Sequence, residues 1–353
     1  FTPEEQSNGK TIRWCQVRVA AEGMKAADGG DDVRGIVCGA SNFEVGDKVV
    51  VCLPGAVLPG DFHITPRKTY GHVSDGMMAS ARELNLNDDH AGIIRLQELG
   101  LDPKVGTDAL EVLNLNEQAA EVNVTPDRGY CFSIRGIARE YSHATGSDFR
   151  DPIGNVHPEA GHGFALKIDD QSPIREKIGS ERFVLRTVKG VDAKRPTPPW
   201  MVARLKLAGM RSISLIVDIT NYAMLELGQP IHAYDLDKIQ GGMVVRRAKA
   251  GEVLVTLDGQ ERKLHPEDLV IADDSGAIGL AGVMGGLSTE VSETTVNVLI
   301  EAAHFEPISI ARTARRHKLP SEASKRFERG VDSNIAEYAA GRVVQLLEVQ
   351  ALG

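Results

Sequence analysis

Several features that would mark a specialised class of protein are missing from this 353-residue chain. No apolar run approaches the roughly 18 residues that a membrane-spanning helix needs, which excludes a helical membrane protein. Lys and Arg number 40 against 49 Asp and Glu, so the net charge is −9. A protein that coats nucleic acid nonspecifically is normally basic. Any nucleic-acid contact must therefore depend on a local basic patch.

Cysteine is also scarce, and no C-x-x-C pair occurs among Cys15, Cys38, Cys52 and Cys131. A chain of this length can bury a core without disulfides, so reduced thiols in a cytoplasmic protein are expected. The chain begins at Phe1, without a basic and apolar leader. We expect it to be an excerpt of a longer protein, located in the cytoplasm.

Familiar catalytic motifs are missing as well. The sequence has no G-x-x-x-x-G-K-[ST] loop, no H-E-x-x-H and no G-x-S-x-G. The run A-G-V-M-G-G at 281–286 is rich in glycine but lacks dinucleotide-binding spacing. The histidines are scattered, so we expect no metal site. Activity, if present, should not depend on an activated nucleophile.

The composition, 42% hydrophobic and 25% charged, is that of a soluble globular protein with two or three domains. We predict a multidomain α+β protein. Residues 1–100 read as short strands and turns, which favours a small β-barrel over a small sandwich. Residues 101–150 form a small α/β connecting module, and residues 151–353 form a mixed α/β domain. The polar, Gly- and Pro-containing segment 148–163 is the linker candidate.

Local patterns place several elements. Residues 120–125 read as a strand, followed by a helix over about 130–143. A helix should open at Pro198-Pro199, and another should cover 218–227 and end at Gly228. Strands are expected at 242–246, 252–257, 269–272 and 295–300, with a hairpin turn at Leu257-Asp258-Gly259 and a last helix from about 335.

Several long segments resemble one family. Residues 53–93, from L-P-G-A-V-L-P-G-D to D-D-H-A-G-I, resemble the tRNA-binding module of bacterial phenylalanyl-tRNA synthetase beta subunits, an oligonucleotide-binding (OB) fold. T-P-D-R-G-Y-C-F-S-I-R-G-I-A-R-E at 125–140 is similar to the segment that follows it. I-V-D-I-T-N-Y-A-M-L-E-L-G-Q-P-I-H-A-Y-D at 216–235, together with 281–286 and 313–331, resembles the editing domain. The segments occur in the family's order over nearly the whole chain.

The resemblance implies a function. An OB-fold barrel would be followed by an editing domain that hydrolyses mischarged tyrosyl-tRNA(Phe). The complete enzyme would attach phenylalanine to tRNA(Phe) with ATP and Mg²⁺, as a two-alpha, two-beta tetramer with an alpha subunit. This chain itself would need no cofactor and would have no ligase activity. In the family, one module normally precedes Phe1 and several follow Gly353, so the barrel could lack its first strand. The opening T-P-E-E-Q-S-N-G-K also departs from the family's H-P-N-A-D type.

Proofreading in this family has a clear physical basis. Tyrosine differs from phenylalanine by one hydroxyl, which an apolar pocket rejects only modestly. A second site should therefore contain a buried polar group that pairs with the hydroxyl. Glu301, at the end of T-V-N-V-L-I-E, is the candidate. On residue type and position alone, Glu301 could equally be a strand-end Glu that pairs with an Arg or faces water. The resemblance implies instead that it recognises the tyrosine hydroxyl.

Other candidate catalytic residues surround the motif D-I-T-N-Y…I-H-A-Y-D. His232 would hold the terminal ribose or the ester, or position water. A structural histidine in a turn is the alternative, and the resemblance implies an editing-site histidine. Thr220 and Asn221 would bind the aminoacyl ester, unless they only bond the backbone. We expect water-mediated hydrolysis in which positioning supplies most of the rate, assisted by the substrate's own ribose hydroxyl.

The substrate pocket should include Gly285, Gly286, Ser321 and Ala323. The glycines allow close approach, and their N–H groups could bind the ester carbonyl or water. A tight turn is the alternative. The family usually has Thr at the position of Ser321, and Ala323 is a small pocket wall or simple core packing.

The clearest cationic region lies at 312–329, and the predicted tRNA contacts are Arg312, Arg315, Arg316, Lys318, Lys325 and Arg326, with Arg329 nearby. Lys68 and Arg82 are weaker candidates in the barrel. These cations would neutralise phosphates of the acceptor end. The alternative is a solvated helix face with Glu322 and Glu328. At the level of the whole chain, the alternatives are a non-catalytic scaffold for tRNA or subunit binding and a stand-alone deacylase.

Overall fold

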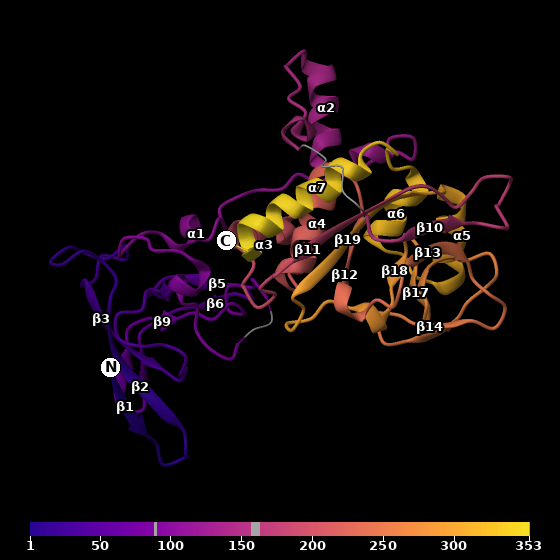
Figure 1. Cartoon of the computed structure of the whole chain (residues 1–353). Coiled ribbons are helices and arrows are strands. Elements are labelled where there is room, and N and C mark those ends of the chain that lie inside the picture. Colours follow the sequence, from indigo (N-terminus) through magenta and orange to yellow (C-terminus); the bar gives the residue numbers. More distant parts are fainter. Residues whose placement is uncertain (88–89, 157–162, 353) are drawn as a thin grey trace. The chain divides into compact units, whose positions relative to one another are not determined.

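The computed structural model describes residues 1–87, 90–156 and 163–352. The fold is mixed α/β, and it divides into two compact units (Figure 1). Unit 1 comprises 1–119 and 196–212, and unit 2 comprises 120–195 and 213–353. Residues 157–162 of the expected linker lie outside the described residues. The three domain ranges expected from the sequence stay a prediction.

The described residues of unit 1 form one three-stranded sheet and three two-stranded ladders. The sheet has the order β1 (Thr2–Glu5), β2 (Thr11–Arg18), β3 (Val33–Cys38), and the ladders are β4 (Val51–Cys52) with β9 (Met77–Met78), β5 (Val57–Leu58) with β6 (Phe62–His63), and β7 (Arg67–Thr69) with β8 (His72–Ser74). Alternation along β2 and β3 buries Cys15, Ile36 and Cys38 in a small core. All four cysteines are free and buried, and burial raises the pKa of Cys15 and Cys52 to about 11.

The expected barrel is not confirmed, since the strands described in unit 1 belong to separate sheets and do not close. The apolar run 48–53 pairs with β9 only through Val51 and Cys52. The chain then turns at Gly55, whose N–H donates to Ile64 O. Unit 1 also contains η1 (Leu96–Leu99), α1 (Ala109–Val112) and α3 (Pro199–Leu207). Helix α3 confirms the helix predicted at Pro198-Pro199.

Unit 2 is built on two larger sheets. The three-stranded antiparallel sheet has the order β11 (Ser180–Lys189), β19 (Asn297–Phe305), β12 (Ile231–Asp235). The five-stranded sheet has the order β10 (Leu166–Asp169), β13 (Met243–Arg247), β16 (Leu269–Asp273), β17 (Gly276–Leu280), β18 (Met284–Gly285). The hairpin β14 (Val253–Val255) and β15 (Glu261–Lys263) confirms the turn predicted at 257–259.

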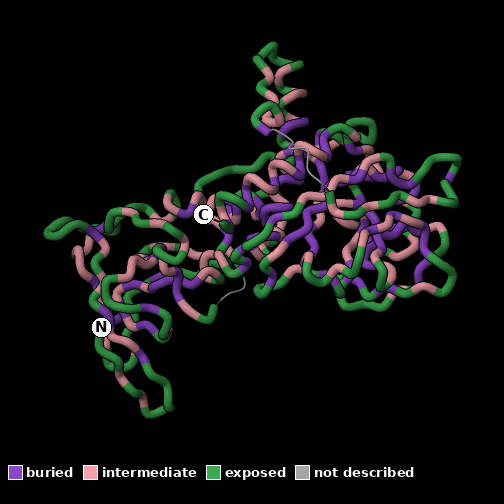
Figure 2. The backbone as a smooth tube through the Cα atoms, viewed as in Figure 1, coloured by how far each residue is buried: buried purple, intermediate pink, exposed green. Residues whose placement is uncertain are grey.

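The main core joins side chains of both sheets. Leu299 and Phe305 from β19 cluster with Met243, Leu269 and Leu280 from the five-stranded sheet. Figure 2 shows the buried backbone stretches in these strands. Because alternate residues of a strand face opposite sides, β19 presents one set of apolar side chains to this core and the other set to the helices.

Helices complete unit 2. They are α2 (Ile134–Thr145), α4 (Leu215–Leu227), α5 (Pro307–His317), α6 (Glu322–Arg329) and α7 (Ala336–Leu347). Short 3₁₀ helices are η2 (Gly129–Cys131), η3 (Pro152–Asn155), η4 (Leu236–Lys238) and η5 (Leu287–Thr289), and α7 is followed by the π-helical segment η6 (Glu348–Leu352). Helix α4 packs on β12, and α7 packs on β11 and β19 (Figure 1). Helix α4 ends at Gly228, where φ is +83°, as predicted.

The prediction for residues 120–143 differs from the structure in two places. Residues 120–125 form no strand, and Val122 stays 54% exposed because no neighbouring strand pairs with the segment. The helix expected from about 130 begins at Ile134. Ser133 caps it by accepting a hydrogen bond from the Gly136 N–H, and the preceding residues 129–131 form a 3₁₀ turn.

Candidate active site

Glu301 lies within β19, not at the end of a strand. The run V-L-I-E-A-A at 298–303 is buried throughout, and β19 continues to Phe305. Glu301 shares a strand face with Leu299 and Ala303, which belong to the main core. Only 6% of Glu301 is exposed. A carboxylate in such surroundings needs a hydrogen-bonding partner, because burying an unpaired charge is strongly unfavourable.

The neighbouring strand supplies that partner. In the antiparallel pairing of β12 with β19, His232 is the direct partner of Glu301, and Tyr234 is the partner of Leu299. His232 and Tyr234 therefore lie on the same face of the sheet as Glu301. The Tyr234 hydroxyl donates a hydrogen bond to Glu301 Oε2. The His232 and Tyr234 rings meet edge to face, with centroids 4.5 Å apart. We call Glu301, His232 and Tyr234 the carboxylate cluster.

Burial sets the protonation of the carboxylate cluster. Burial raises the pKa of Glu301 to about 7, while the hydrogen bond from Tyr234 opposes this shift. Burial lowers the pKa of His232 to about 4, so its imidazole is neutral at pH 7. The pKa of Tyr234 rises well above its usual value because of burial and the adjacent carboxylate. The cluster thus combines a neutral imidazole with a carboxyl group that titrates near neutrality.

His232 has an unused nitrogen. Its Nε2 is buried and makes no hydrogen bond within the described structure. Gly285 of β18 lies directly beside the ring: a Cβ at this position would come within 2.4 Å of His232 Cε1 and 2.7 Å of Nε2. Any larger residue would displace the imidazole. Since buried polar atoms are nearly always bonded, the free Nε2 suits contact with a ligand.

Gly286 is held differently from Gly285. Its N–H donates to Ile278 O at 2.8 Å, and a Cβ there would lie 2.5 Å from the same oxygen. The Gly286 N–H is thus already used in sheet pairing, and it is not free to bind an ester or water as predicted. The carbonyl of Gly285 accepts from the Leu257 N–H at 3.1 Å. Of the two glycines, Gly285 is the one beside the carboxylate cluster.

Ser321 and Ala323 belong to the start of α6. The Ser321 hydroxyl caps the helix by accepting from Ser324 N at 3.0 Å, and it donates to Val283 O at 3.1 Å. The second bond ties α6 to the glycine-rich segment that contains Gly285. Ala323 is half-buried against the main core. Ser321 therefore positions the glycine segment, and its hydroxyl already has partners in the protein.

Thr220 and Asn221 lie on α4. The Thr220 hydroxyl donates to Val217 O at 2.7 Å, within its own helix. Asn221 is half-buried. Among the described residues, no hydrogen bond links either side chain to Glu301 or His232. The structure thus joins Glu301, His232 and Gly285 directly, but not the other predicted polar groups.

Three of the predicted tRNA-binding cations, Arg312, Arg316 and Arg326, are bonded to protein groups. Arg312 and Arg316 pair with Glu267, at 3.1 and 2.7 Å, and Arg316 also bonds buried Asp268. Arg326 is only 4% exposed, since its guanidinium donates to the carbonyls of Phe132 and Glu322. The structure gives Arg326 a packing role, and a phosphate contact is not proposed for it.

The remaining cations are more accessible. Lys325 lies over the Phe132 ring, 4.7 Å from its centre. Arg315 and Lys318 are exposed at the end of α5, and Lys68 and Arg82 are exposed in unit 1. Among the described residues, no ion pair is found for Arg315 or Lys318. A phosphate could therefore approach both side chains without breaking one.

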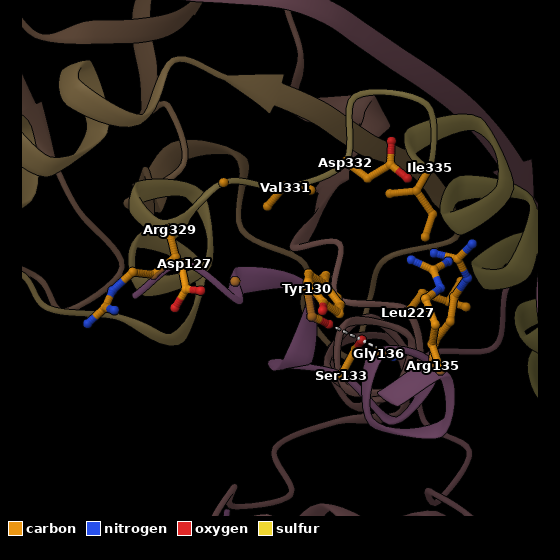
Figure 3. A pocket seen from close by; sticks show the side chains of 14 residues that line it. Asp127, Tyr130, Ser133, Arg135, Gly136, Leu227, Arg329, Val331, Asp332 and Ile335 are labelled. Atoms are coloured by element: carbon orange, nitrogen blue, oxygen red, sulfur yellow. Dashed lines mark hydrogen bonds between the residues drawn. The ribbon is translucent and has the colours of Figure 1, made fainter. Parts of the chain in front are cut away.

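A cavity of about 360 Å³ lies elsewhere in unit 2 (Figure 3). Tyr130, Arg135, Gly228 and Arg329 are among its lining residues, and Glu301 and His232 are not. Arg135 is already held by both oxygens of Asp151, at 2.7 and 2.6 Å. The cavity is therefore separate from the carboxylate cluster.

Two features are missing from the part of the chain that the structure describes. No group of three or more His, Cys, Asp or Glu side chains is arranged to hold a metal ion. No helix there is long and apolar enough to cross a bilayer.

Tyr234 was not singled out from the sequence. The signal was available in the alternation of I-H-A-Y-D, which puts residues 232 and 234 on one face of a strand. Recognising its contact with Glu301 also needed the pairing of β12 with β19, which the sequence does not specify.

Comparison with known proteins gives a consistent result. The B3/4 domain family matches residues 179–351. The phenylalanine–tRNA ligase beta subunit of Leifsonia xyli is 71% identical over 100% of this chain and 42% of that protein. Those of Bifidobacterium longum and Streptomyces avermitilis are 52% and 56% identical, each over 98% of this chain, and over 42% and 40% of their own lengths. The chain thus spans about two fifths of these relatives.

A solved N-terminal fragment of the phenylalanyl-tRNA synthetase beta subunit from Pyrococcus horikoshii is a more distant match. Its identity is 15% and its TM-score 0.33, with 63% of this chain and 71% of that chain covered.

Proposed function

Because the chain belongs to the phenylalanine–tRNA ligase beta-subunit family, we propose that it binds tRNA(Phe) and hydrolyses mischarged tyrosyl-tRNA(Phe). The observation that carries this proposal is the carboxylate cluster: buried Glu301 faces His232 across two paired strands. The B3/4 match covers this region of the chain.

Glu301 provides the selectivity in this proposal. Its buried carboxylate accepts the hydroxyl proton of a tyrosyl group, and a phenylalanyl group leaves the same acceptor without that bond. Sites built to bond a substrate hydroxyl discriminate strongly against the analogue that lacks it, because the buried polar group stays unpaired. The correct product, phenylalanyl-tRNA(Phe), is thereby spared.

Hydrolysis itself requires positioned water and a held ester. The free Nε2 of His232 bonds the ester end of the substrate or the attacking water. Gly285, which has no side chain, leaves room for the imidazole itself. The low pKa of His232 keeps the imidazole neutral, so Nε2 serves as a hydrogen-bonding group and not as a fixed charge. Proximity supplies most of the rate, with the substrate's ribose hydroxyl assisting.

The tRNA is held by exposed cations in this proposal. Arg315 and Lys318, at the end of α5, contact phosphates of the acceptor end. Residues 1–100 act as an OB-type tRNA-binding domain in which Lys68 and Arg82 contact the tRNA. The support for this part is the sequence resemblance of residues 53–93 to the tRNA-binding module. Residues 101–150 then connect this domain to the editing domain at 151–353.

The complete ligase remains a proposal for this chain. We propose that the protein works in the cytoplasm with an alpha subunit in a two-alpha, two-beta tetramer. The tetramer attaches phenylalanine to tRNA(Phe) using ATP and Mg²⁺. Residues 1–353 alone would contribute editing and no ligase activity.

One observation favours a second candidate, a non-catalytic scaffold for tRNA or subunit binding. Three polar groups expected at the ester or in the substrate pocket are already bonded inside the protein: the Thr220 hydroxyl, the Ser321 hydroxyl and the Gly286 N–H. If none of them is released, His232 and Glu301 are left as the main polar contacts to a substrate.

A deacylation assay separates the candidates. The 353-residue chain is mixed with tyrosyl-tRNA(Phe) and with phenylalanyl-tRNA(Phe), and ester loss is followed over time. We expect faster loss of the tyrosyl ester, and at least a tenfold fall on Glu301→Gln. Glu306→Gln is the matched control, because Glu306 is also buried but caps α5. Tight tRNA binding without ester cleavage would select the scaffold.

A further inference from the structure

We propose that Tyr234 is a positioning residue for substrate selection: its phenol holds Glu301 Oε2 and so leaves Oε1 as the acceptor for the substrate's phenol. This inference rests on the proposed function and extends it. The protein would thus contain one permanent phenol at the same carboxylate that recognises the phenol of the mischarged amino acid.

The strand register explains how Tyr234 reaches Glu301. Tyr234 is paired with Leu299, two residues before Glu301 on the same strand, so the two side chains are diagonal neighbours on one face. Diagonal Cα atoms lie about 7–8 Å apart, a span that an aromatic side chain can bridge. Tyr234 is 1% exposed and also packs against the His232 ring. A side chain so enclosed cannot swing away when a ligand arrives.

The two oxygens of Glu301 have different surroundings. Oε2 accepts from Tyr234, whereas Oε1 has no hydrogen-bond donor within the described residues. A carboxylate can accept on both oxygens at once. Fixing Oε2 restricts rotation of the carboxyl group about its last bond, and Oε1 then points in one direction. A substrate phenol at Oε1 would complete the set of partners.

The same bond influences the charge of Glu301. Donation from Tyr234 opposes the effect of burial, and so keeps the carboxyl group ionised at lower pH than burial alone would allow. His232 is the other titratable side chain facing Glu301. The partner of Glu301 on β11, Leu185, is uncharged, as is Gly285 of β18, which lies against His232. Tyr234 is therefore the main side-chain influence on the charge of this acceptor.

The decisive variant is Tyr234→Phe, which keeps the ring and removes the hydroxyl. We expect kcat/KM for tyrosyl-tRNA(Phe) to fall about tenfold or more, the range of one lost hydrogen bond to a charged group. Hydrolysis of phenylalanyl-tRNA(Phe) should change little, so the ratio between the substrates falls. The titration midpoint of Glu301, followed by carbon-13 NMR of the carboxyl group, should rise.

The chain offers a matched control. Tyr130 also donates its hydroxyl to a glutamate, Glu140, but at the surface of unit 2. Tyr130→Phe should leave both the substrate ratio and the Glu301 midpoint unchanged. If Tyr234→Phe does not fold, 3,5-difluorotyrosine at position 234 retains the contact with a stronger donor. It should lower the Glu301 midpoint and preserve selectivity.

The possible failures are distinct. If the unaltered chain does not cleave tyrosyl-tRNA(Phe), the proposed function is wrong, while the NMR midpoint still tests the Tyr234 contact. If the unaltered chain cleaves it and Tyr234→Phe keeps the full preference for the tyrosyl ester, the positioning role is overturned. An equal loss on both esters would reduce Tyr234 to a packing residue and would also overturn it.

Discussion

His232 and Glu301 are direct partners across the antiparallel pair β12 and β19, and both side chains face the same side of the sheet. They are 69 residues apart in the chain, and the strand register alone brings them together. Burial shifts the two pKa values in opposite directions. It lowers the pKa of His232 to about 4, so the imidazole is neutral at pH 7, and it raises the pKa of Glu301 to about 7.

Gly285→Ala should remove activity by moving the imidazole. The added Cβ would come within 2.4 Å of His232 Cε1, so the ring must shift. We expect at least a tenfold fall in tyrosyl-tRNA(Phe) hydrolysis, with a loss of about 1–3 kcal/mol in the free energy of unfolding. Gly279→Ala is the control on the adjacent strand β17, where the nearest atom to a Cβ is 3.7 Å away. Equal activities of the two variants would mean that the His232 position is unimportant.

His232→Leu should separate activity from stability. The substitution removes a buried nitrogen that has no partner in the described structure, so the free energy of unfolding should stay constant or increase. Hydrolysis should nevertheless fall at least tenfold, because Nε2 is lost as a contact for ester or water. Urea unfolding and deacylation of the same preparation measure both effects. A strong loss of stability would indicate that His232 is mainly a structural residue.

The sequence predicted part of this arrangement. The amphipathic pattern and Gly228 predicted α4, and L-D-G predicted the hairpin at 257–259, because these signals are local. The sequence predicted that the strand ends at Glu301. In the structure β19 continues beyond it, since Tyr234 provides the partner that burial demands.

Other predictions missed partners that only the tertiary fold provides. The sequence predicted Arg326 as a surface cation. In the structure Arg326 is buried, and its guanidinium donates hydrogen bonds to the carbonyls of Phe132 and Glu322. The N–H of Gly286 read as free, yet it pairs with Ile278 O. The expected barrel depends on the pairing of distant strands, which short apolar runs do not determine.

Glu301→Gln should change how stability depends on pH. The pKa of Glu301 is raised in the folded state, so its contribution to stability is complete below the unfolded-state pKa, near 4.5, and is lost as pH rises through about 7. Glutamine does not titrate. Relative to the unaltered chain, the variant should therefore gain up to ~3 kcal/mol between pH 4.5 and 8.

The measurement is urea unfolding of both proteins at several pH values. His232 contributes in the opposite direction: its pKa is lowered to about 4, so its contribution is present above pH 6.5 and is lost as pH falls through 4. His232 is present in both proteins, so its effect cancels in the difference. A difference that does not vary with pH would show that Glu301 is not raised by burial.

Arg315→Ala combined with Lys318→Ala should weaken tRNA binding without affecting the fold. Both side chains are exposed at the end of α5. Each cation that neutralises a phosphate releases a counterion, so the slope of log affinity against log salt should decrease by about 2 for the double variant. Arg326→Ala is the contrasting variant, because its guanidinium is buried and bonded. It should lower the free energy of unfolding and leave the salt slope unchanged. If the double variant binds tRNA(Phe) with the original slope, the acceptor end lies on another surface.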